Sequence, residues 1–277
     1  MLCGTLAMLR TLTLAALTAL SIAPQDAPRE PTSEEKSLVA RLAEQNVVLD
    51  PVRGFCSIPA DVLVRDDLLE YLLVGPAGAA HESGFMTPVS ASVLNVALLA
   101  LGATPGTNAS WKAKDPLPTE DQVRAGVMPY ELTLPAGSGF HLYVGWRQDG
   151  ETYFYRVEDL IRNLASGTAM KRHEWIYLGS RMIPNGRTGA AAGEVFAADT
   201  YQNLINLAFF SEGYTLATGA LPECMDQTIW MLNPFLVPER GARVGFIFSR
   251  TKIGSVTPEV ERLLPDLPAS AAEPKDR

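Results

Sequence analysis

The chain has 277 residues, of which 47% are hydrophobic, and its 23 Lys and Arg against 31 Asp and Glu give a net charge of −8. This acidic balance, together with the lack of any basic run, argues against nucleic acids and anionic membrane surfaces as partners. The length and the apolar content suffice for one domain with a substantial core.

Residues 1–23 are typical of a cleavable secretory signal peptide. Arg10, the only charged residue of this segment, lies just ahead of an apolar stretch from Leu12 to Ala23. The stretch is shorter than the ~20 residues of a membrane span. We therefore expect an exported protein, periplasmic or in the cell envelope, with no integral membrane span in the mature chain. Because Pro24 follows the most natural cleavage point, an uncleaved N-terminal anchor or a buried hydrophobic helix is the alternative.

Composition divides the rest of the chain. Residues 24–35 are rich in Pro and in charged residues, which is typical of a flexible linker. A single domain is expected over 36–263, and the tail 264–277 is expected to be disordered. Within the domain, 103–138 is rich in Pro and has little periodicity. This stretch indicates a long surface excursion or a link between two subdomains.

Two cysteines, Cys56 and Cys224, remain once the signal segment with Cys3 is removed. An even pair in an oxidising compartment predicts a disulfide, and closing so long a loop would stabilise the fold by ~4–5 kcal/mol in the chain-entropy model. The alternative is two separate buried thiols.

Residues 68–86 contain two apolar runs separated by the turn residues 75–78, which predicts an antiparallel hairpin. Thr87 and Pro88 then suit the N-cap and first position of a helix that ends at Gly102. Because apolar residues lie on nearly every face of this helix, about 88–102, we expect it to be buried at the centre of the domain.

A second hairpin is predicted where Asp149 and Gly150 separate two aromatic runs. Four further strands are expected over 174–180, 194–199, 204–210 and 242–249. No regular alternation of strands and helices supports a parallel, doubly wound sheet. The expected fold class is α+β, with a mainly antiparallel sheet, the buried central helix and few other helices.

The block from residue 68 to residue 106 resembles the YdjY-like domain family of bacterial proteins. The resemblance rests on Leu69-Glu70, Gly78, His81-Glu82-Ser83, Pro88, Ala97-Leu98-Leu99, Gly102 and Pro105-Gly106, and more loosely on 175–180, 197–199, 204–207, Asn233, Val237-Pro238 and Gly241. It covers roughly 48–250 and implies an exported bacterial domain without an established reaction. One departure is Gly84, where the family pattern has a large apolar residue.

The candidate site is formed by Glu70, His81, Glu82 and Ser83 on the first predicted hairpin. With a loop at 75–78, Glu70, His81 and Ser83 share one face and Glu82 lies on the other. Glu70 and His81 are then diagonal neighbours, ~7–8 Å apart along the backbones. Three uses are open: a Glu-oriented His with Ser83 as nucleophile, a His/Glu metal pair, or a hydrogen-bonded pair that stiffens the hairpin.

Secondary contacts are expected from other parts of the chain. The second hairpin places His141 opposite Glu158 as a pair at the rim, and His173 in a polar run is expected to face solvent. Asp199 follows a strand, and Asn203 and Asn206 flank the next one, so polar side chains gather at this corner. Asp199 alternatively caps its own turn.

The sequence has no glycine-rich phosphate loop, no Cys-x-x-Cys motif and no His-Glu-x-x-His motif, so it predicts no cofactor with a strong signature. We expect an exported, non-catalytic domain that binds a small ligand or an envelope protein. Binding would use the face around Glu70 and His81 and the aromatic strands. The alternatives are a hydrolase or metal-dependent enzyme that uses His81 with Glu70, Glu82 or Ser83, and a purely structural envelope component.

Overall fold

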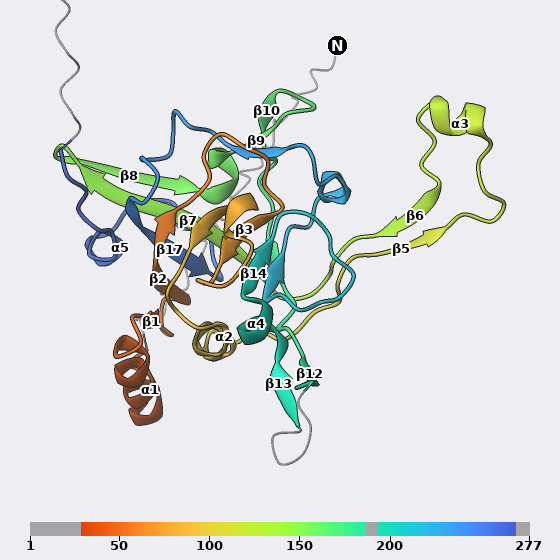
Figure 1. Ribbon diagram of the computed structural model, residues 1–277. Helices are drawn as coiled ribbons and strands as arrows, with labels where there is room; N and C mark the ends of the chain where they lie inside the picture. Colours follow the sequence, from red (N-terminus) through yellow and green to blue (C-terminus); the bar gives the residue numbers. More distant parts are fainter. Residues whose placement is uncertain (1–28, 187–192, 270–277) are drawn as a thin grey trace, which may run out of the picture. The chain divides into compact units, whose positions relative to one another are not determined.

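The computed structural model describes residues 29–186 and 193–269 (Figure 1). The signal-like segment 1–23 and most of the tail 264–277 therefore lie outside the described residues. The following description concerns the unit Pro31–Arg277 by itself.

Eight strands of the main sheet close into a barrel, because the last of them, β4 (Ser83–Met86), pairs back with the first, β2 (Phe55–Val62). In spatial order the barrel strands are β2 (Phe55–Val62), β17 (Arg243–Ser249), β7 (Gly139–Gln148), β11 (Trp175–Tyr177), β15 (Ala217–Thr218), β14 (Asn203–Asn206), β3 (Tyr71–Val74) and β4 (Ser83–Met86). Two edge strands, β1 (Val48–Asp50) and β8 (Glu151–Arg156), extend the long strands β2 and β7 beyond the closed ring.

Three small sheets and five short α-helices complete the described part of the chain. The sheets join β9 (Ile161–Asn163), β10 (Thr168–Ala169) and β16 (Trp230–Leu232); β12 (Met182–Pro184) and β13 (Glu194–Phe196); and β5 (Ser110–Ala113) and β6 (Tyr130–Thr133). The helices are α1 (Ser33–Ala43), α2 (Ala91–Ala100), α3 (Glu120–Arg124), α4 (Ala197–Tyr201) and α5 (Pro258–Glu261). None of the described helices is long and apolar enough to cross a membrane.

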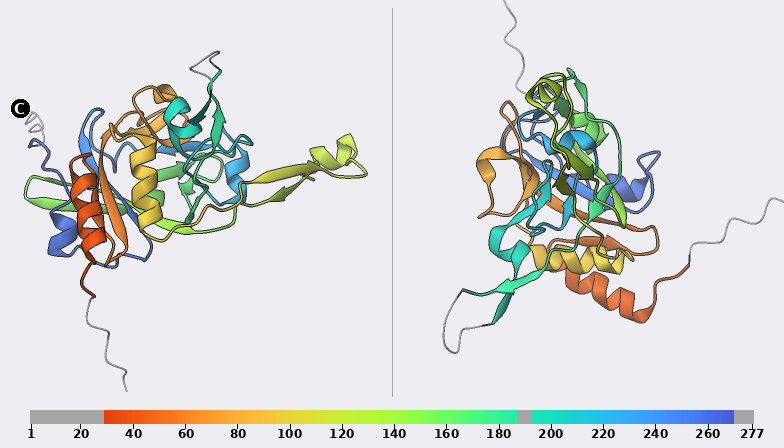
Figure 2. Two further views of the ribbon diagram at one scale, coloured as in Figure 1. Left: turned by 90° about the horizontal axis from the view of Figure 1, so that it is seen from below. Right: turned by 90° about the vertical axis from the view of Figure 1, so that its right-hand side faces the viewer.

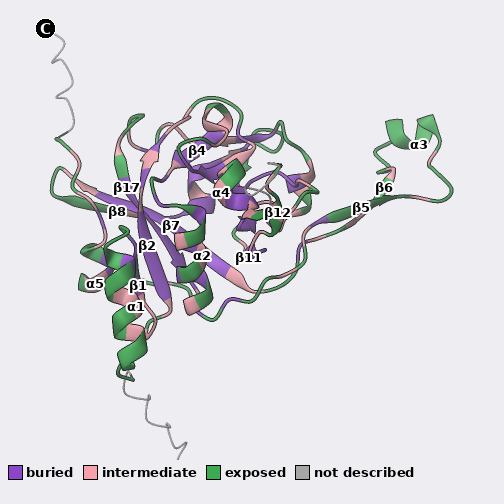
Figure 3. Cartoon of the chain, turned by 60° about the horizontal axis from the view of Figure 1, so that its bottom comes forward, coloured by how far each residue is buried: buried purple, intermediate pink, exposed green. Residues whose placement is uncertain are grey.

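Aromatic side chains pack the core of the barrel. Phe140 on β7 contacts Phe248 on β17 and Tyr177 on β11, edge to face, at ring-centroid distances of 6.1 and 6.3 Å. Edge-to-face pairs of this kind add ~0.5–1.5 kcal/mol each beyond the burial of their area. The strands β2 and β17 are buried along most of their length (Figure 3).

The expected α+β class with a buried central helix is wrong, since the chain is mostly β around a closed barrel. The helix does exist as α2, and it ends as expected at Gly102, whose φ is +76°. Its N-cap is Ser90. Only one face is buried, with Leu94 and Leu98 inside, whereas Leu99 is 45% exposed. The helix α2 therefore has apolar residues on every face but is buried on one face only.

The first predicted hairpin is also wrong, because β3 and β4 run parallel, with Tyr71 opposite Ser83. Residues 75–82 cross back from the end of β3 to its start. Two residues at the start of β14 hold this return: Gly75 donates its N–H to the carbonyl of Gln202, just ahead of the strand, and Ala79 donates its N–H to Oδ1 of Asn203, its first residue. A Cβ at Gly78 would lie 2.6 Å from the Gln202 carbonyl oxygen, so only glycine permits this approach.

The second predicted hairpin is confirmed. β7 and β8 pair in antiparallel register on either side of Asp149 and Gly150. These two residues have φ values of +53° and +80°, as a type I′ turn requires.

The predicted excursion 103–138 contains a separate two-stranded sheet, β5 with β6, and the short helix α3 between them (Figures 1 and 2). All of β5 is exposed. Asn108, at the start of this excursion, donates from Nδ2 to the Phe210 carbonyl at 2.6 Å.

The predicted disulfide is wrong, because Cys56 and Cys224 are both free and buried. Cys56 lies on β2 in the core, while Cys224 lies in the 3₁₀ turn Pro222–Met225. Burial raises the pKa of both thiols, that of Cys224 to about 12. Both cysteines therefore behave as small apolar side chains.

Candidate functional site: an aromatic pocket beside Glu70

The four residues of the predicted site are close in the chain but not arranged as expected, because the parallel register of β3 and β4 removes the shared face. The His81 side chain is 82% exposed and its Nε2 lies 3.7 Å from Glu82 Oε2. Ser83 is fully buried, and its hydroxyl donates to the Ala79 carbonyl. The Glu70 N–H donates to the Glu82 carbonyl at 3.0 Å.

This arrangement gives the catalytic alternative no support. A buried serine whose hydroxyl is engaged cannot reach a substrate. The Glu82 carboxylate, 3.7 Å from His81 Nε2, is too far away to hold the exposed imidazole by a hydrogen bond. Within 29–186 and 193–269, no group of three or more His, Cys, Asp or Glu could hold a metal ion. The role of these residues stays a prediction.

The three residues expected to make secondary contacts, His141, Asp199 and Asn203, have different surroundings in the structure. His141 is buried against Arg156 and Glu174 instead of forming a rim pair, with Nδ1 3.2 Å from Arg156 Nη1 and Nε2 3.5 Å from Glu174 Oε1. Asp199 accepts the Ser92 N–H in the first turn of α2 at 3.0 Å. Asn203 alone of the three lies beside the first predicted hairpin, where it accepts the Ala79 N–H.

The aromatic pocket lies next to Glu70 and has a volume of about 380 Å³. Its lining residues are Tyr71, Tyr201, Asn203, Asn206, Phe210, Glu212, Tyr214 and Thr215. Most of them follow one another in the chain around β14, between the end of α4 and the start of β15. The fold thus brings a single stretch of sequence against Tyr71 of β3.

Two stacked aromatic pairs form the apolar lining of the pocket. Tyr71 and Phe210 are stacked at a centroid distance of 5.0 Å, with 5° between their planes. Tyr201 and Tyr214 are stacked at 4.6 Å and 9°. Stacking fixes the rings in place, so the pocket is formed before any ligand arrives.

Asn206 is the unusual polar group of the pocket. It lies directly opposite Tyr71 in the pairing of β14 with β3, so the two side chains share a face. The residue is only 5% exposed, and its buried Oδ1 has no hydrogen-bond partner among the described residues. A buried acceptor without a donor costs ~1–3 kcal/mol, so this oxygen calls for a donor from outside the chain.

The electrostatic environment of the pocket is negative. The pKa of Tyr71 is raised to about 12, first by burial and then by the charges of Glu70, Glu82 and Glu212, while a hydrogen bond with Asn203 opposes the shift. The pKa of Glu70 is raised as well, by burial and by the nearby charge of Glu82. None of the lining residues is a Lys or Arg, so the pocket favours a cation over an anion.

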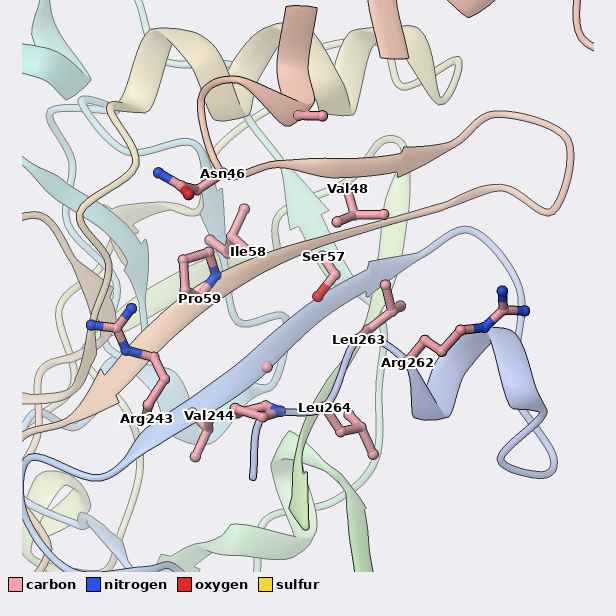
Figure 4. A pocket seen from close by; sticks show the side chains of 13 residues that line it. Asn46, Val48, Ser57, Ile58, Pro59, Arg243, Val244, Arg262, Leu263 and Leu264 are labelled. Atoms are coloured by element: carbon pink, nitrogen blue, oxygen red, sulfur yellow. The ribbon is translucent and has the colours of Figure 1, made fainter. Parts of the chain in front are cut away.

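A second pocket of about 380 Å³ is a weaker candidate. Figure 4 shows Ser57, Val244 and Leu264 among the side chains around it, from β2, β17 and the segment after α5. Most of its lining side chains are apolar. Among the described residues, none that lines it has a buried polar side-chain atom without a hydrogen-bond partner. It therefore indicates no particular ligand.

Sequence reasoning found part of the aromatic pocket. It predicted a polar corner at Asn203 and Asn206, and it named Glu70, which lies beside the pocket. It did not assign Tyr71, Phe210 and Tyr214 to a site. The available signal was the density of such side chains, since four aromatic residues and both asparagines lie within 201–214.

Comparisons with protein-family models, with curated proteins and with solved structures returned no match to this chain. The resemblance to the YdjY-like family thus stays a prediction.

Proposed function

We propose that this chain is a binding protein whose aromatic pocket holds a small organic ammonium compound. The observation that carries the proposal is the buried, unpartnered Oδ1 of Asn206, a residue that lines the pocket. An acceptor of this kind is satisfied by an N–H donor of the ligand, and a charged donor forms a stronger bond than a neutral one.

The rest of the pocket agrees with a positively charged ligand. A cation close to an aromatic face gains ~0.5–2 kcal/mol. The Arg181 guanidinium already lies over the Tyr214 ring at 4.8 Å, so Tyr71 and Phe210 are the rings that the ligand would contact. The carboxylates of Glu70, Glu82 and Glu212 add an attractive field. The volume lies near the lower end of the ~300–1,000 Å³ of small-molecule pockets, which suits an amine with one ring or a short chain.

Export is part of the same proposal. The segment 1–23 has the charge and apolar pattern of a signal peptide, and a binding protein for small molecules is compatible with the periplasm or envelope. Mass spectrometry of the protein recovered from cells tests this part alone: loss of the N-terminal segment supports export by cleavage, and an intact N-terminus contradicts it.

Isothermal titration calorimetry with benzylammonium tests the binding proposal. We expect saturable binding to the full chain near the millimolar range, ~−4 kcal/mol. Benzyl alcohol, the uncharged analogue, should bind more weakly by ~10-fold or more, because it lacks the charge and offers fewer donors. Equal binding of the two probes, or no binding of benzylammonium, contradicts the proposal.

Two variants identify the site. Asn206→Leu keeps the side-chain volume and removes the acceptor, so it should weaken benzylammonium binding ~10-fold or more while the free energy of unfolding stays the same or rises. Glu212→Gln should weaken binding by a smaller factor, ~1.4–5-fold. Glu131→Gln makes the same charge change on the exposed strand β6, at a residue that does not line the pocket, and should leave the affinity unchanged.

A further inference from the structure

A third pocket has the opposite electrostatic character to the aromatic pocket. It has a volume of about 460 Å³ and is lined by Tyr143, Phe154, Arg156, Asp159, Arg172 and Lys252, with the segment 253–256 as its remaining wall. We call it the cationic pocket. It lies at β7, β8 and the loop after β17 and shares no lining residue with the aromatic pocket.

Arg156 is built into the wall of the cationic pocket. Its side chain is 9% exposed and is held by the fully buried Glu158 through Nε and Nη2. Nη2 also donates to the His173 carbonyl at 2.6 Å, and Nη1 faces His141 Nδ1 at 3.2 Å. These partners occupy every N–H of the guanidinium except one on Nη1, for which the described residues provide no acceptor.

Tyr143 offers a second donor to the same space. Its ring lies 5.6 Å from the Arg156 guanidinium carbon. Its hydroxyl oxygen accepts the Ile253 N–H at 2.8 Å, so its own hydrogen is free to donate, and the described structure shows no acceptor for it.

The charges of the cationic pocket add up to one uncompensated positive charge. Arg156 is paired with Glu158, and Arg172 is paired through two hydrogen bonds, at 2.8 and 2.6 Å, with Asp159. Lys252 is exposed and has no ion-pair partner within the described ranges. The positive field reaches His141, whose pKa is lowered first by burial, then by Arg156 and Lys252, against the opposing charges of Glu174 and Glu158.

We infer that the cationic pocket binds the carboxylate of a small organic acid. The carboxylate would accept from Arg156 Nη1 and the Tyr143 hydroxyl and balance the charge of Lys252. The apolar walls at Phe154 and Ile253 suit a ligand with an apolar body. A single negative charge matches the uncompensated charge, whereas a dianionic phosphate would bring one negative charge more than the pocket compensates.

Calorimetry of the full chain with 3-phenylpropionate tests this inference. We expect saturable binding that weakens as salt is added, because screening reduces the attraction of the partly exposed charges. The neutral 3-phenylpropionamide should bind at least ~10-fold more weakly. Equal affinity for the amide, or tighter binding of phenyl phosphate than of the carboxylate, overturns the inference.

The variant Lys252→Gln places the binding in the cationic pocket. It should weaken binding of 3-phenylpropionate by about threefold or more, and Lys112→Gln on the exposed strand β5, with the same charge change, should not. Arg156 is left intact in this test, since its removal would strand Glu158 without a counter-charge. Unchanged affinity in Lys252→Gln overturns the assignment, and so does displacement of 3-phenylpropionate by benzylammonium.

Discussion

Replacement of Glu158 by glutamine tests how far the buried ion pair supports the fold. Glu158 is fully buried, accepts from Arg156 through two nitrogens, and also accepts the Trp175 indole N–H at 3.1 Å. Glutamine keeps the shape but removes the charge, so Arg156 stays 9% exposed without a counter-ion. Breaking one side of a buried pair costs ~3–5 kcal/mol. This is a large part of the ~5–15 kcal/mol of a typical domain.

Urea unfolding followed by circular dichroism measures this loss, provided that the slope against urea concentration is unchanged. The adjacent variant Asp159→Asn is the matched control. It makes the same charge change at the more exposed pair with Arg172, for which we expect a loss of only ~0–1 kcal/mol. A Glu158→Gln protein as stable as the Asp159→Asn protein refutes the reasoning that Arg156 depends on its buried partner.

Three further outcomes follow from the fold. Leu94→Ala should destabilise the protein by ~2–5 kcal/mol, and Leu99→Ala, on the exposed face of the same helix, by at most ~0.5 kcal/mol; equal losses in urea unfolding would contradict a one-faced helix. Gly78→Ala should cost ~1–3 kcal/mol because its Cβ would meet the Gln202 carbonyl, and a neutral effect on the melting temperature would contradict the tight return between β3 and β4. Burial lowers the pKa of His141 and His173 from 6.5 in the folded protein, so the unfolded chain binds protons more readily. The free energy of unfolding should therefore fall as the pH drops from 6.5 towards the lower folded-state pKa values. Unfolding curves at several pH values should show a smaller fall for His141→Gln.

Local chemistry predicted those elements whose geometry depends on a few adjacent residues. Asp149 and Gly150 determine the turn between β7 and β8 because both adopt positive φ. Gly102 likewise ends α2 where the sequence indicated. In each case the deciding interaction lies within the turn or cap itself, so no distant part of the chain was needed.

Elements that depend on distant partners could not be predicted in the same way. A hairpin was expected at 75–78, yet the return loop is held by Gln202 and Asn203, more than a hundred positions further along. Alternation along two short strands does not tell whether they pair parallel or antiparallel. The buried face of α2 could not be predicted either. Its outer face is also apolar, so the sequence does not indicate which face packs against the barrel.

The candidate site follows the same rule. The sequence indicated polar side chains around Asn203 and Asn206 and a carboxylate at Glu70, and these do lie near one another. The contribution of Tyr71 depends on the pairing of β3 with β14, which no local pattern reveals. The buried state of Asn206 Oδ1 is likewise a property of the folded chain.

The central claim is that Asn206 and the surrounding aromatic rings hold an organic ammonium group. A crystal structure of the full chain with benzylammonium tests it most directly. We expect the ammonium nitrogen within hydrogen-bonding distance of Asn206 Oδ1, ~2.7–3.2 Å, with the ring of the ligand against Phe210. Benzylammonium bound elsewhere, with the aromatic pocket holding none, would contradict it.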